Sequence, residues 1–373
     1  MYLDCAIFEN YRNIGHYPFS FDKGINILYG KNAQGKTNVV EGIYLFSAGK
    51  SFRHARERDL ILSDKNFSQV SISYVDSVRE NKMSMRFFRE MSKEMFKNGV
   101  KIGRMSNFIG NFKSVLFCPE HLSIVKDEPA ERRTFLDNAI SQIDRPYLAA
   151  LMEHKKLLEQ RNALLKNAEQ AGESFALTIE VLSEKLADSA AMITAARAKY
   201  LTRLFALVNG YLQEMTGKRE SVTFRYLSHI SETDETEALF DVEENRKKYR
   251  TVLTKDVAKE TVIGSTIGGA HRDDFEILLN GMNAKIFASQ GQQRSIALSM
   301  KLAEGEISRE ESGEYPVFLL DDVLSELDRE RKEYVLSELH DRQVILTTCD
   351  ENDFAGIGNT TKIYVENGNY FYQ

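Results

Sequence analysis

Apolar runs of the length and alternation typical of β-strands occupy both ends of the chain, and the middle lacks them. In the N-terminal part, these runs cover residues 1–8, 17–21, 24–29, 67–74, 83–88 and 114–117. In the C-terminal part, they cover residues 275–279, 284–287, 316–320, 344–348, 362–365 and 370–372. The runs at 316–320 and 344–348 are almost entirely apolar, which indicates strands of a parallel sheet buried on both faces. Asn98-Gly99 is typical of a hairpin turn.

Helical spacing follows two of these strands and dominates the middle of the chain. Amphipathic helices are predicted directly after residue 37, after residue 294 and at 329–340, and another begins at Pro129. Residues 147–215 contain no proline, and their apolar positions recur in threes and fours, as in a coiled coil. The stripe after Gly172 consists of Phe175, Ile179, Leu182, Leu186, Ser189, Ile193, Ala196 and Tyr200. Two helices that reverse near Gly172 would form a helical hairpin.

The order of these elements predicts an α/β lobe assembled from both ends of the chain. We expect its N-terminal part at about residues 1–118 and its C-terminal part at about residues 264–373. The intervening residues, about 119–263, would form a helical insertion lobe that carries the coiled-coil hairpin. Within the insertion, residues 231–244 are strongly acidic and are expected to form a solvated helix or loop.

Composition narrows the class of protein. The chain has 373 residues, of which 42% are hydrophobic, so it can bury a sizeable core. No apolar run reaches the length of a membrane span, and the N-terminus lacks the basic-then-apolar order of a signal peptide. Cys5, Cys118 and Cys349 are far apart and form no C-x-x-C motif. A cytoplasmic protein is expected. Its net charge of −6 argues against a globally basic coat, although not against a local basic surface.

Residues 30–37 fit the phosphate-binding pattern G-x-x-x-x-G-K-[ST] at every fixed position. The eight residues are Gly30, Lys31, Asn32, Ala33, Gln34, Gly35, Lys36 and Thr37. A predicted strand precedes them and a predicted helix follows, which is the setting that the motif requires. The glycines let the backbone N–H groups point at phosphate oxygens, and the helix N-terminus adds its positive dipole end. Lys36 would bridge the β- and γ-phosphates of ATP, and Thr37 would bind Mg²⁺. The alternative is a chance glycine turn ahead of a helix.

The apolar strand at 316–320 runs into two carboxylates, Asp321 and Asp322. A strand that ends in a carboxylate beside a phosphate loop can hold Mg²⁺, directly or through water. Asp321 is therefore the expected metal partner. Asp322 would orient or deprotonate the water that attacks the nucleotide. The alternative is an apolar strand that ends in a solvated acidic turn.

A second candidate anion site lies between these motifs. The sequence Ser-Gln-Gly-Gln-Gln-Arg at 289–294 opens a predicted helix. Taken alone, such a serine and glycine would be only a helix cap. Placed between a phosphate loop and an aspartate strand, they could grip a γ-phosphate through the Ser289 hydroxyl, the Gly291 N–H and the helix dipole. Ser289 and Lys36 begin two helices that lie more than 250 residues apart in the sequence, and we expect Ser289, Gly291 and Gln292 to bind the ATP of a second subunit.

A basic cluster at residues 50–58 includes Lys50, Arg53 and Arg56. These residues are candidates for contact with DNA phosphates, which would make binding depend on salt. A solvated basic face is an equally good interpretation.

Together the motifs resemble the ABC-type ATPase heads of the SMC and Rad50 class, and within it the RecF family of bacterial recombination mediators. The resemblance covers nearly the whole chain. It rests on the phosphate loop continued through Asn38 to Glu41, and on blocks at 50–53, 132–137, 160–162, 269–274, 289–294 and 319–328. It implies an ABC-type P-loop ATPase head and an ATP-dependent DNA-binding protein of recombinational repair. It also implies a head-to-tail dimer on ATP that acts with RecR and RecO at gapped DNA to help load RecA.

Five positions depart from the patterns expected of the proteins that this chain resembles. Ala270 stands where the family usually has proline, and Phe52 where histidine is common. Asp322 replaces the glutamate of most ABC enzymes, although RecF proteins commonly have aspartate there. Thr347 and Thr348 stand where ABC ATPases place a switch histidine. Slow hydrolysis, acting as a switch, is therefore expected. The block His271-Arg-Asp-Asp274 suggests no chemistry, and a turn held by an Arg–Asp pair would explain it equally well.

Other ATPase classes fit the sequence less well. SMC and Rad50 tethers have arms of hundreds of residues and a hinge or zinc hook, whereas this arm is short and holds no cysteine. The ATPase subunit of a transporter would lack the coiled hairpin and the strands that precede the phosphate loop. A metabolic kinase has no use for the motif at 289–293.

Overall fold

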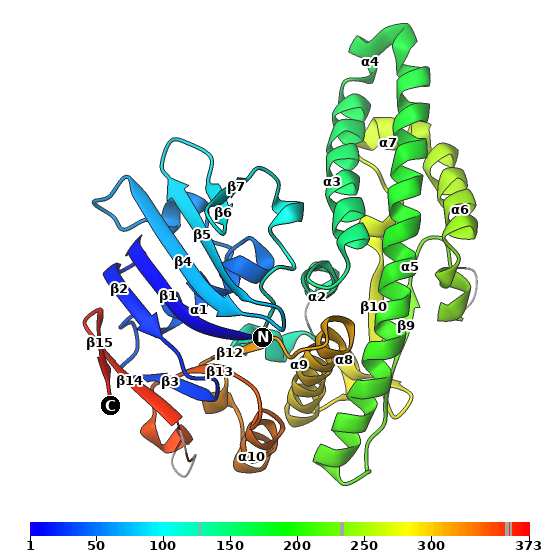
Figure 1. Cartoon of the computed structure of the whole chain (residues 1–373). Coiled ribbons are helices and arrows are strands. Elements are labelled where there is room, and N and C mark those ends of the chain that lie inside the picture. The colour runs from blue at the N-terminus through cyan, green and yellow to red at the C-terminus, as the bar shows by residue number, and fades with distance from the viewer. Residues whose placement is uncertain (127, 232–234, 355–357, 359) are drawn as a thin grey trace. The chain divides into compact units, whose positions relative to one another are not determined.

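The computed structural model describes residues 1–126, 128–231, 235–354, 358 and 360–373, and the chain divides into two compact units (Figure 1). Unit 1 consists of Met1–Ser123 and Gly291–Gln373, and unit 2 consists of Ile124–Gln290. The first boundary lies close to the one expected near residue 118. The second differs from the one expected near residue 264, because residues 264–290 contribute two strands to a sheet of unit 2.

The first sheet of unit 1 is mainly parallel and carries the predicted buried strands. Its order is β15-β14-β3-β13-β12-β8, and only the β14–β15 pair is antiparallel. The strands are β3 (Ile25–Tyr29), β8 (Ser114–Phe117), β12 (Val317–Asp321), β13 (Val344–Thr348), β14 (Thr360–Glu366) and β15 (Asn369–Tyr372). Every residue of β3, β8, β12 and β13 is buried, which confirms the burial predicted for β12 and β13. Since β13 lies between β3 and β12, the ends of these three strands meet at one edge.

The second sheet of unit 1 is antiparallel, with the order β2-β1-β4-β5-β6-β7. Its strands are β1 (Tyr2–Tyr11), β2 (Ile14–Ser20), β4 (Phe67–Val75), β5 (Glu80–Phe88), β6 (Glu94–Lys97) and β7 (Val100–Ile102). The predicted hairpin turn is confirmed: Asn98 and Gly99 connect β6 to β7 with φ angles of 50° and 80°. Along β4 and β5, buried residues alternate with more exposed ones, so this sheet buries one face.

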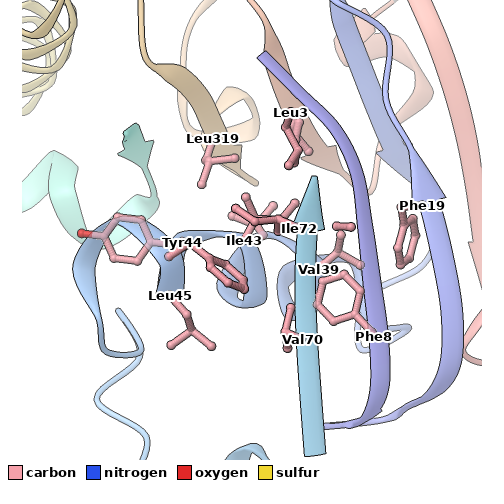
Figure 2. Close-up of a cluster of buried hydrophobic side chains, with 14 of the residues drawn as sticks. Leu3, Phe8, Phe19, Val39, Ile43, Tyr44, Leu45, Val70, Ile72 and Leu319 are labelled. Carbon is pink, nitrogen blue, oxygen red and sulfur yellow. The ribbon is translucent and has the colours of Figure 1, made fainter. Parts of the chain in front are cut away.

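Helix α1 (Lys36–Ala48) packs against both sheets of unit 1. Its residues Val39, Val40 and Ile43 belong to one buried cluster with strand residues of the two sheets. That cluster includes Leu3, Phe8, Phe19, Val70 and Ile72 of the antiparallel sheet and Leu28, Leu319 and Ile345 of the parallel sheet. Figure 2 shows ten of these core side chains with labels. The core therefore fixes the orientation of the helix that begins at Lys36. Two further helices, α9 (Gln290–Ser312) and α10 (Arg329–Glu338), follow later in the chain.

Unit 2 is built around the predicted helical hairpin. Its helices are α2 (Pro129–Ser141), α3 (Arg145–Lys166), α4 (Ala168–Ala171), α5 (Phe175–Thr216), α6 (Val242–Lys255), α7 (Val257–Ile263) and α8 (Ala284–Phe287). Helices α3 and α5 pack together, and the predicted stripe along α5 is buried or half-buried throughout (Figure 1). The chain reverses near Gly172, whose φ is 53°. Among the described residues, none of the helices combines the length and apolar character that crossing a membrane requires.

Unit 2 also contains a three-stranded sheet, which the sequence pattern did not predict in full. The order is β11-β10-β9, from β9 (Val222–Leu227), β10 (Asp274–Leu279) and β11 (Met282–Asn283). The prediction of a strand at residues 284–287 is wrong, because they form α8. The Asn283 side chain accepts a hydrogen bond from the N–H of Lys285 at 2.9 Å and caps this helix. Of the acidic stretch at 231–244, residues 232–234 lie outside the described residues, and Asp241 caps α6.

The block His271-Arg-Asp-Asp274 anchors a buried polar network in unit 2. Asp273 is 1% exposed and accepts hydrogen bonds from the hydroxyls of Thr194 at 2.8 Å, Tyr226 at 3.0 Å and Tyr249 at 3.2 Å. Asp274 receives two hydrogen bonds from Arg132, at 2.8 and 2.7 Å. Asp274 is therefore held by an Arg–Asp pair, but the arginine comes from α2 and not from the block itself. These contacts tie α2, α5, α6 and β9 to the start of β10.

Candidate functional site

The predicted phosphate loop joins the buried strand β3 to α1 in unit 1. Gly35 precedes the helix with φ 111°, and among the described side chains none caps the first turn of α1. The first amide N–H groups of a helix have no partner within the helix. Here they open toward the loop, and the first turn holds no acidic residue. The loop and the helix N-terminus together can therefore bind an anion.

Both glycines of the loop are required by close contacts as well as by backbone conformation. Gly30 has φ 142°, and a Cβ there would lie 2.3 Å from the carbonyl oxygen of Val365. At Gly35, a Cβ would lie 2.8 Å from Oδ1 of Asn13. Ala33 also has a positive φ, 63°, which non-glycine residues adopt rarely. The loop is thus held in a strained conformation by the neighbouring strands, as is typical of functional loops.

Lys36 lies inside this loop. Its ammonium donates hydrogen bonds to the carbonyl oxygens of Gly30 at 2.6 Å and Lys31 at 2.8 Å. Burial lowers the pKa of Lys36, while the nearby Cys349, Asp322 and Asp321 oppose that shift. The ammonium is therefore fixed at the centre of the loop. There, the negatively charged oxygens of a bound phosphate would pair with its positive charge.

Asp321 at the end of β12 contacts the residue that follows Lys36. Its Oδ1 accepts hydrogen bonds from the hydroxyls of Thr37 at 2.9 Å and Thr347 at 2.7 Å. Burial raises the pKa of Asp321, the two hydroxyls lower it, and Asp322 raises it further. The structure thus brings together the two residues that the sequence assigned to Mg²⁺, Thr37 and Asp321, although 284 positions separate them.

Asp322 has a backbone conformation unusual for its residue type, with φ 49°. Its N–H donates to both the carbonyl oxygen of Thr347, at 3.2 Å, and the Thr347 hydroxyl, at 3.0 Å. Thr347 therefore holds both aspartates, a role that its place in the sequence did not reveal. The available signal was that β13 is a second buried apolar strand ending in hydroxyl side chains, which would place them beside a neighbouring strand end.

These groups line one cleft of about 280 Å³ in unit 1. The lining residues are Asn32, Ala33, Gln34, Gly35, Lys36, Thr37, Asn38, Arg53, Asp322 and Thr347. Most of the predicted nucleotide-binding residues and the candidate water-orienting Asp322 thus share a surface. Pockets that enclose most of a small ligand have volumes of about 300–1,000 Å³. The cleft lies just below that range.

Arg53, predicted to bind DNA, lines this cleft. Its guanidinium donates to Oδ1 of Asn38 at 3.3 Å, and Asn38 in turn donates to Oδ1 of Asn13 at 2.7 Å. Lys50 and Arg56 are exposed and are not among the described residues that line the cleft. All three basic residues are exposed, and of them Arg53 is the one that also lines the cleft, as far as the described residues show.

A buried carboxylate stabilises α1 one turn after Thr37. Glu41 is fully buried and accepts two hydrogen bonds from Arg12, at 2.8 and 2.6 Å, and one from the Tyr11 hydroxyl at 3.2 Å. The Ser51 hydroxyl also donates to it. Sequence reasoning did not identify Arg12; the available signal was an acidic residue among the apolar positions of α1.

The motif at 289–294 forms the start of α9 as predicted, since the helix begins at Gln290. No acidic residue lies in its first turn. The roles of Ser289, Gly291 and Gln292 toward a second subunit remain predictions.

Comparison with known proteins shows which family contains this arrangement. Residues 2–370 match the family described as RecF/RecN/SMC N terminal domain. The chain is 36% identical to the DNA replication and repair protein RecF of Caldanaerobacter subterraneus subsp. tengcongensis, over 95% of this chain and 96% of that protein. It is 37% identical to the protein of the same name from Clostridium acetobutylicum, over 100% of this chain and 97% of that protein.

Solved structures agree with this assignment. A structure described as the recombination mediator protein RecF-ATPrS in the RecFOR pathway superimposes with a TM-score of 0.91 at 35% identity, covering 100% of this chain and 98% of that one. An Smc head domain from Pyrococcus furiosus superimposes with a TM-score of 0.57 at 16% identity, covering 100% and 96%, and so supports the fold alone. The expected ABC-type ATPase head fold is therefore confirmed, and the chain belongs to the RecF family of DNA replication and repair proteins.

Proposed function

We propose that this chain is an ATP-dependent DNA-binding protein of recombinational repair, which binds Mg²⁺ and ATP in the cleft above β3, β12 and β13. The observation that carries the proposal is the 2.9 Å contact between the Thr37 hydroxyl and the Asp321 carboxylate. This contact joins the phosphate loop to the strand β12, which ends in the candidate Mg²⁺ ligand Asp321. ATP hydrolysis requires a phosphate loop and a metal-binding carboxylate side by side. The relatives' names, which refer to DNA replication and repair and to RecF bound to ATP, support the same function.

Each nucleotide-binding residue has a role that follows from its position. The N–H groups of residues 30–37 and the Lys36 ammonium would hold the phosphates. Thr37 and Asp321 offer oxygen ligands, which Mg²⁺ prefers, and typical Mg²⁺ sites complete their shell with phosphate oxygens and water. Bound Mg²⁺ would neutralise negative charge on the phosphates.

Asp322 would orient the attacking water and accept its proton. Its backbone is fixed by Thr347, so the carboxylate is presented to the cleft from a rigid strand end. Aspartate is one methylene shorter than the glutamate of most ABC enzymes, and it would reach less far toward the water. Hydrolysis is therefore expected to be slow and to release the protein from DNA.

The ATP site would be completed by a second copy of the chain. The cleft in one subunit is small, and Ser289, Gly291 and Gln292 at the start of α9 supply a hydroxyl and helix N–H groups suited to a γ-phosphate. In a head-to-tail homodimer related by a two-fold axis, each subunit would contribute these residues to the other's ATP. Dimer formation would then depend on ATP.

On DNA, the dimer would act at gapped sites with RecR and RecO to help load RecA. Lys50 and Arg56 are exposed candidates for contacts with DNA phosphates. Arg53 remains a candidate as well, although its place in the cleft also suits a contact with the nucleotide. The related recombination mediator protein RecF is described as acting in a RecFOR pathway, which supports these partners.

A mixing experiment tests the composite site. Lys36→Ala keeps an intact Ser289 loop, and Ser289→Arg keeps an intact phosphate loop; each variant alone should be inactive. In a mixed dimer, one of the two sites combines the intact phosphate loop of the Ser289→Arg subunit with the intact Ser289 loop of the Lys36→Ala subunit. The mixture should recover part of the ATPase activity, or at least ATP-dependent dimer formation measured by light scattering. If no mixing ratio restores either property, Ser289 does not act in trans and the proposal is wrong.

A further inference from the structure

Two arginines connect the segment after Asp322 to the first turns of α9, and all residues involved belong to unit 1. Figure 1 shows where α9 and α10 lie in the chain. Arg331 lies in the first turn of α10, and Arg294 lies in α9. Their partners are Ser295 on α9 and Glu326 and Asp328 in the turn between β12 and α10. We call these five residues the arginine latch.

Arg331 connects α10 to the beginning of α9. Its Nε donates to the Ser295 hydroxyl at 2.8 Å, and that hydroxyl donates to the carbonyl oxygen of Gly291 at 3.1 Å. Another guanidinium nitrogen pairs with Asp328, which caps α10. A Cβ on Gly291 would lie only 3.2 Å from Arg331, so the glycine makes room for the guanidinium. The position of Gly291, the expected γ-phosphate ligand, is thus linked to the start of α10.

Arg294 makes the second connection, to the turn that follows Asp322. It donates to the backbone carbonyl of Glu326 and, at 2.8 Å, to the Glu326 carboxylate. Glu326 ends a short 3-10 helix, Leu324–Glu326, that begins two residues after Asp322. Within the same turn, the Ser325 hydroxyl donates to the carbonyl oxygen of Asp322 at 2.7 Å. A shift of Asp322 would therefore be transmitted to α9.

We propose that the arginine latch couples the two ATP sites of the dimer, with Arg331 and Arg294 as positioning residues. The inference rests on the proposed composite site. In that dimer, Asp322 of one subunit serves its own ATP, while Gly291 of the same subunit serves the partner's ATP. Because the latch joins these two segments, ordering one of them at a bound nucleotide orders the other. Occupancy of one site then favours closure of the second, which is positive coupling.

The chemistry of the latch suits positioning rather than stability. Its ion pairs are partly exposed: the side chains of Arg331 and Asp328 are 25% and 52% exposed, and those of Arg294 and Glu326 are 37% and 46% exposed. Pairs of this kind contribute little to the stability of the fold. The planar guanidinium of Arg331 can contact Ser295 and Asp328 at once in a fixed geometry, whereas the single ammonium of lysine cannot reproduce it. Substitution should therefore leave a folded protein.

The test compares latch variants with a control on the same helix. Arg331→Lys and Arg294→Gln each remove the geometry of one connection. Arg329→Lys and Arg329→Gln are the matched controls, since the Arg329 side chain is 88% exposed and pairs with Glu333 of its own helix. ATP binding is measured by titration at protein concentrations too low for dimers. ATP-dependent dimer formation is measured by light scattering, and the Hill coefficient is taken from the ATPase rate.

With wild type and the controls, dimer formation and hydrolysis should depend steeply on ATP. In the latch variants, the Hill coefficient should fall toward 1, and the ATP midpoint for dimer formation should rise about fivefold or more. The ATP affinity of the monomer should change less than about twofold, because the phosphate loop, Asp321 and Asp322 of the same subunit are unaltered.

Three results would overturn the proposal, and they are distinguishable from one another. If wild type forms no dimer with ATP, the proposed function itself fails and the latch fails with it. If wild type dimerises cooperatively and the latch variants match it, the proposed function stands and the latch does not couple the sites. If the Arg329 variants lose cooperativity as the latch variants do, surface charge rather than the latch is responsible.

Discussion

The buried ion pair between Glu41 and Arg12 should be a main support of the helix that carries Lys36 and Thr37. We consider Glu41→Met, which replaces the carboxylate by an apolar side chain of similar size. The change removes a group that is fully buried and accepts hydrogen bonds from Arg12, Tyr11 and Ser51. All three donors would lose their shared acceptor.

The magnitude follows from burial. Removing one partner of a buried ion pair typically costs about 3–5 kcal/mol, because the other charge is left without compensation. The Arg12 side chain is 18% exposed, so its guanidinium can regain some water, and we expect about 3 kcal/mol for Glu41→Met. Arg12→Met should cost more, about 4 kcal/mol, because Glu41 has no access to water. In the double variant no buried charge remains, so its loss should be at least about 2 kcal/mol smaller than the sum.

Urea unfolding followed by far-ultraviolet circular dichroism provides the measurement, since the chain has no tryptophan. Because a chain of two units need not unfold in a single step, the free energies are compared for one unfolding transition. It is the transition whose urea midpoint shifts in the single variants while its dependence on urea concentration stays constant. The exposed pair Arg329 and Glu333 is the matched control, and its coupling should be below about 1 kcal/mol. Additive losses in the Arg12 and Glu41 cycle, or a loss below about 1 kcal/mol for Glu41→Met, would refute this reasoning.

Four further predictions concern the site. Lys36→Met should abolish ATP-dependent dimer formation, because it removes the ammonium fixed at the centre of the loop; unchanged nucleotide affinity by calorimetry would contradict the loop assignment. Asp322→Asn should bind ATP with Mg²⁺ but hydrolyse it poorly, so that the dimer persists on DNA; a variant that stays monomeric under conditions where wild type dimerises would give Asp322 an earlier role. Burial raises the pKa of Asp321, so its protonated form persists to higher pH than in an ordinary aspartate. Mg²⁺-dependent ATP affinity should therefore fall on acidification through that raised pKa, with a weaker fall in Asp321→Asn, as calorimetry between about pH 5 and about pH 8 would show. Lys50→Ala and Arg56→Ala should each reduce by about 1 the slope of the logarithm of DNA affinity against the logarithm of salt concentration. Unchanged slopes would support the alternative that these residues form a solvated basic face.

Much of the fold follows from local pattern. The apolar runs that became β12 and β13 predicted strands buried on both faces, and the stripe on α5 predicted a packed helix face; the structure has both. Residues 284–287 show the limit of such reasoning. Their apolar side chains favour a strand, but the Asn283 cap forms a short helix that leaves Ile286 and Phe287 exposed. A local hydrogen bond decided the element against the propensity of its residues.

For the candidate site, the sequence identified the groups but not their arrangement. The sequence of residues 30–37 specifies a phosphate loop, and the pair Asp321-Asp322 specifies a strand that ends in carboxylates. Each motif can be recognised because its chemistry depends on a few consecutive residues. The contact between Thr37 and Asp321 depends on the strand order β3-β13-β12, which no local pattern encodes. The same order places Thr347 between the two motifs, where it binds both aspartates.

The sequence by itself thus determined which residues could carry phosphate and metal chemistry, since motif identity is a property of neighbours along the chain. Tertiary structure decided which distant residues support them. Arg12 pairs with Glu41 across 29 positions, and Arg331 reaches Ser295 across 36. Tertiary structure also places Arg53, a predicted DNA-binding residue, at the cleft beside the phosphate loop. The physical reason is the same in each case: packing of the sheets and helices brings side chains together at distances that sequence separation does not reveal.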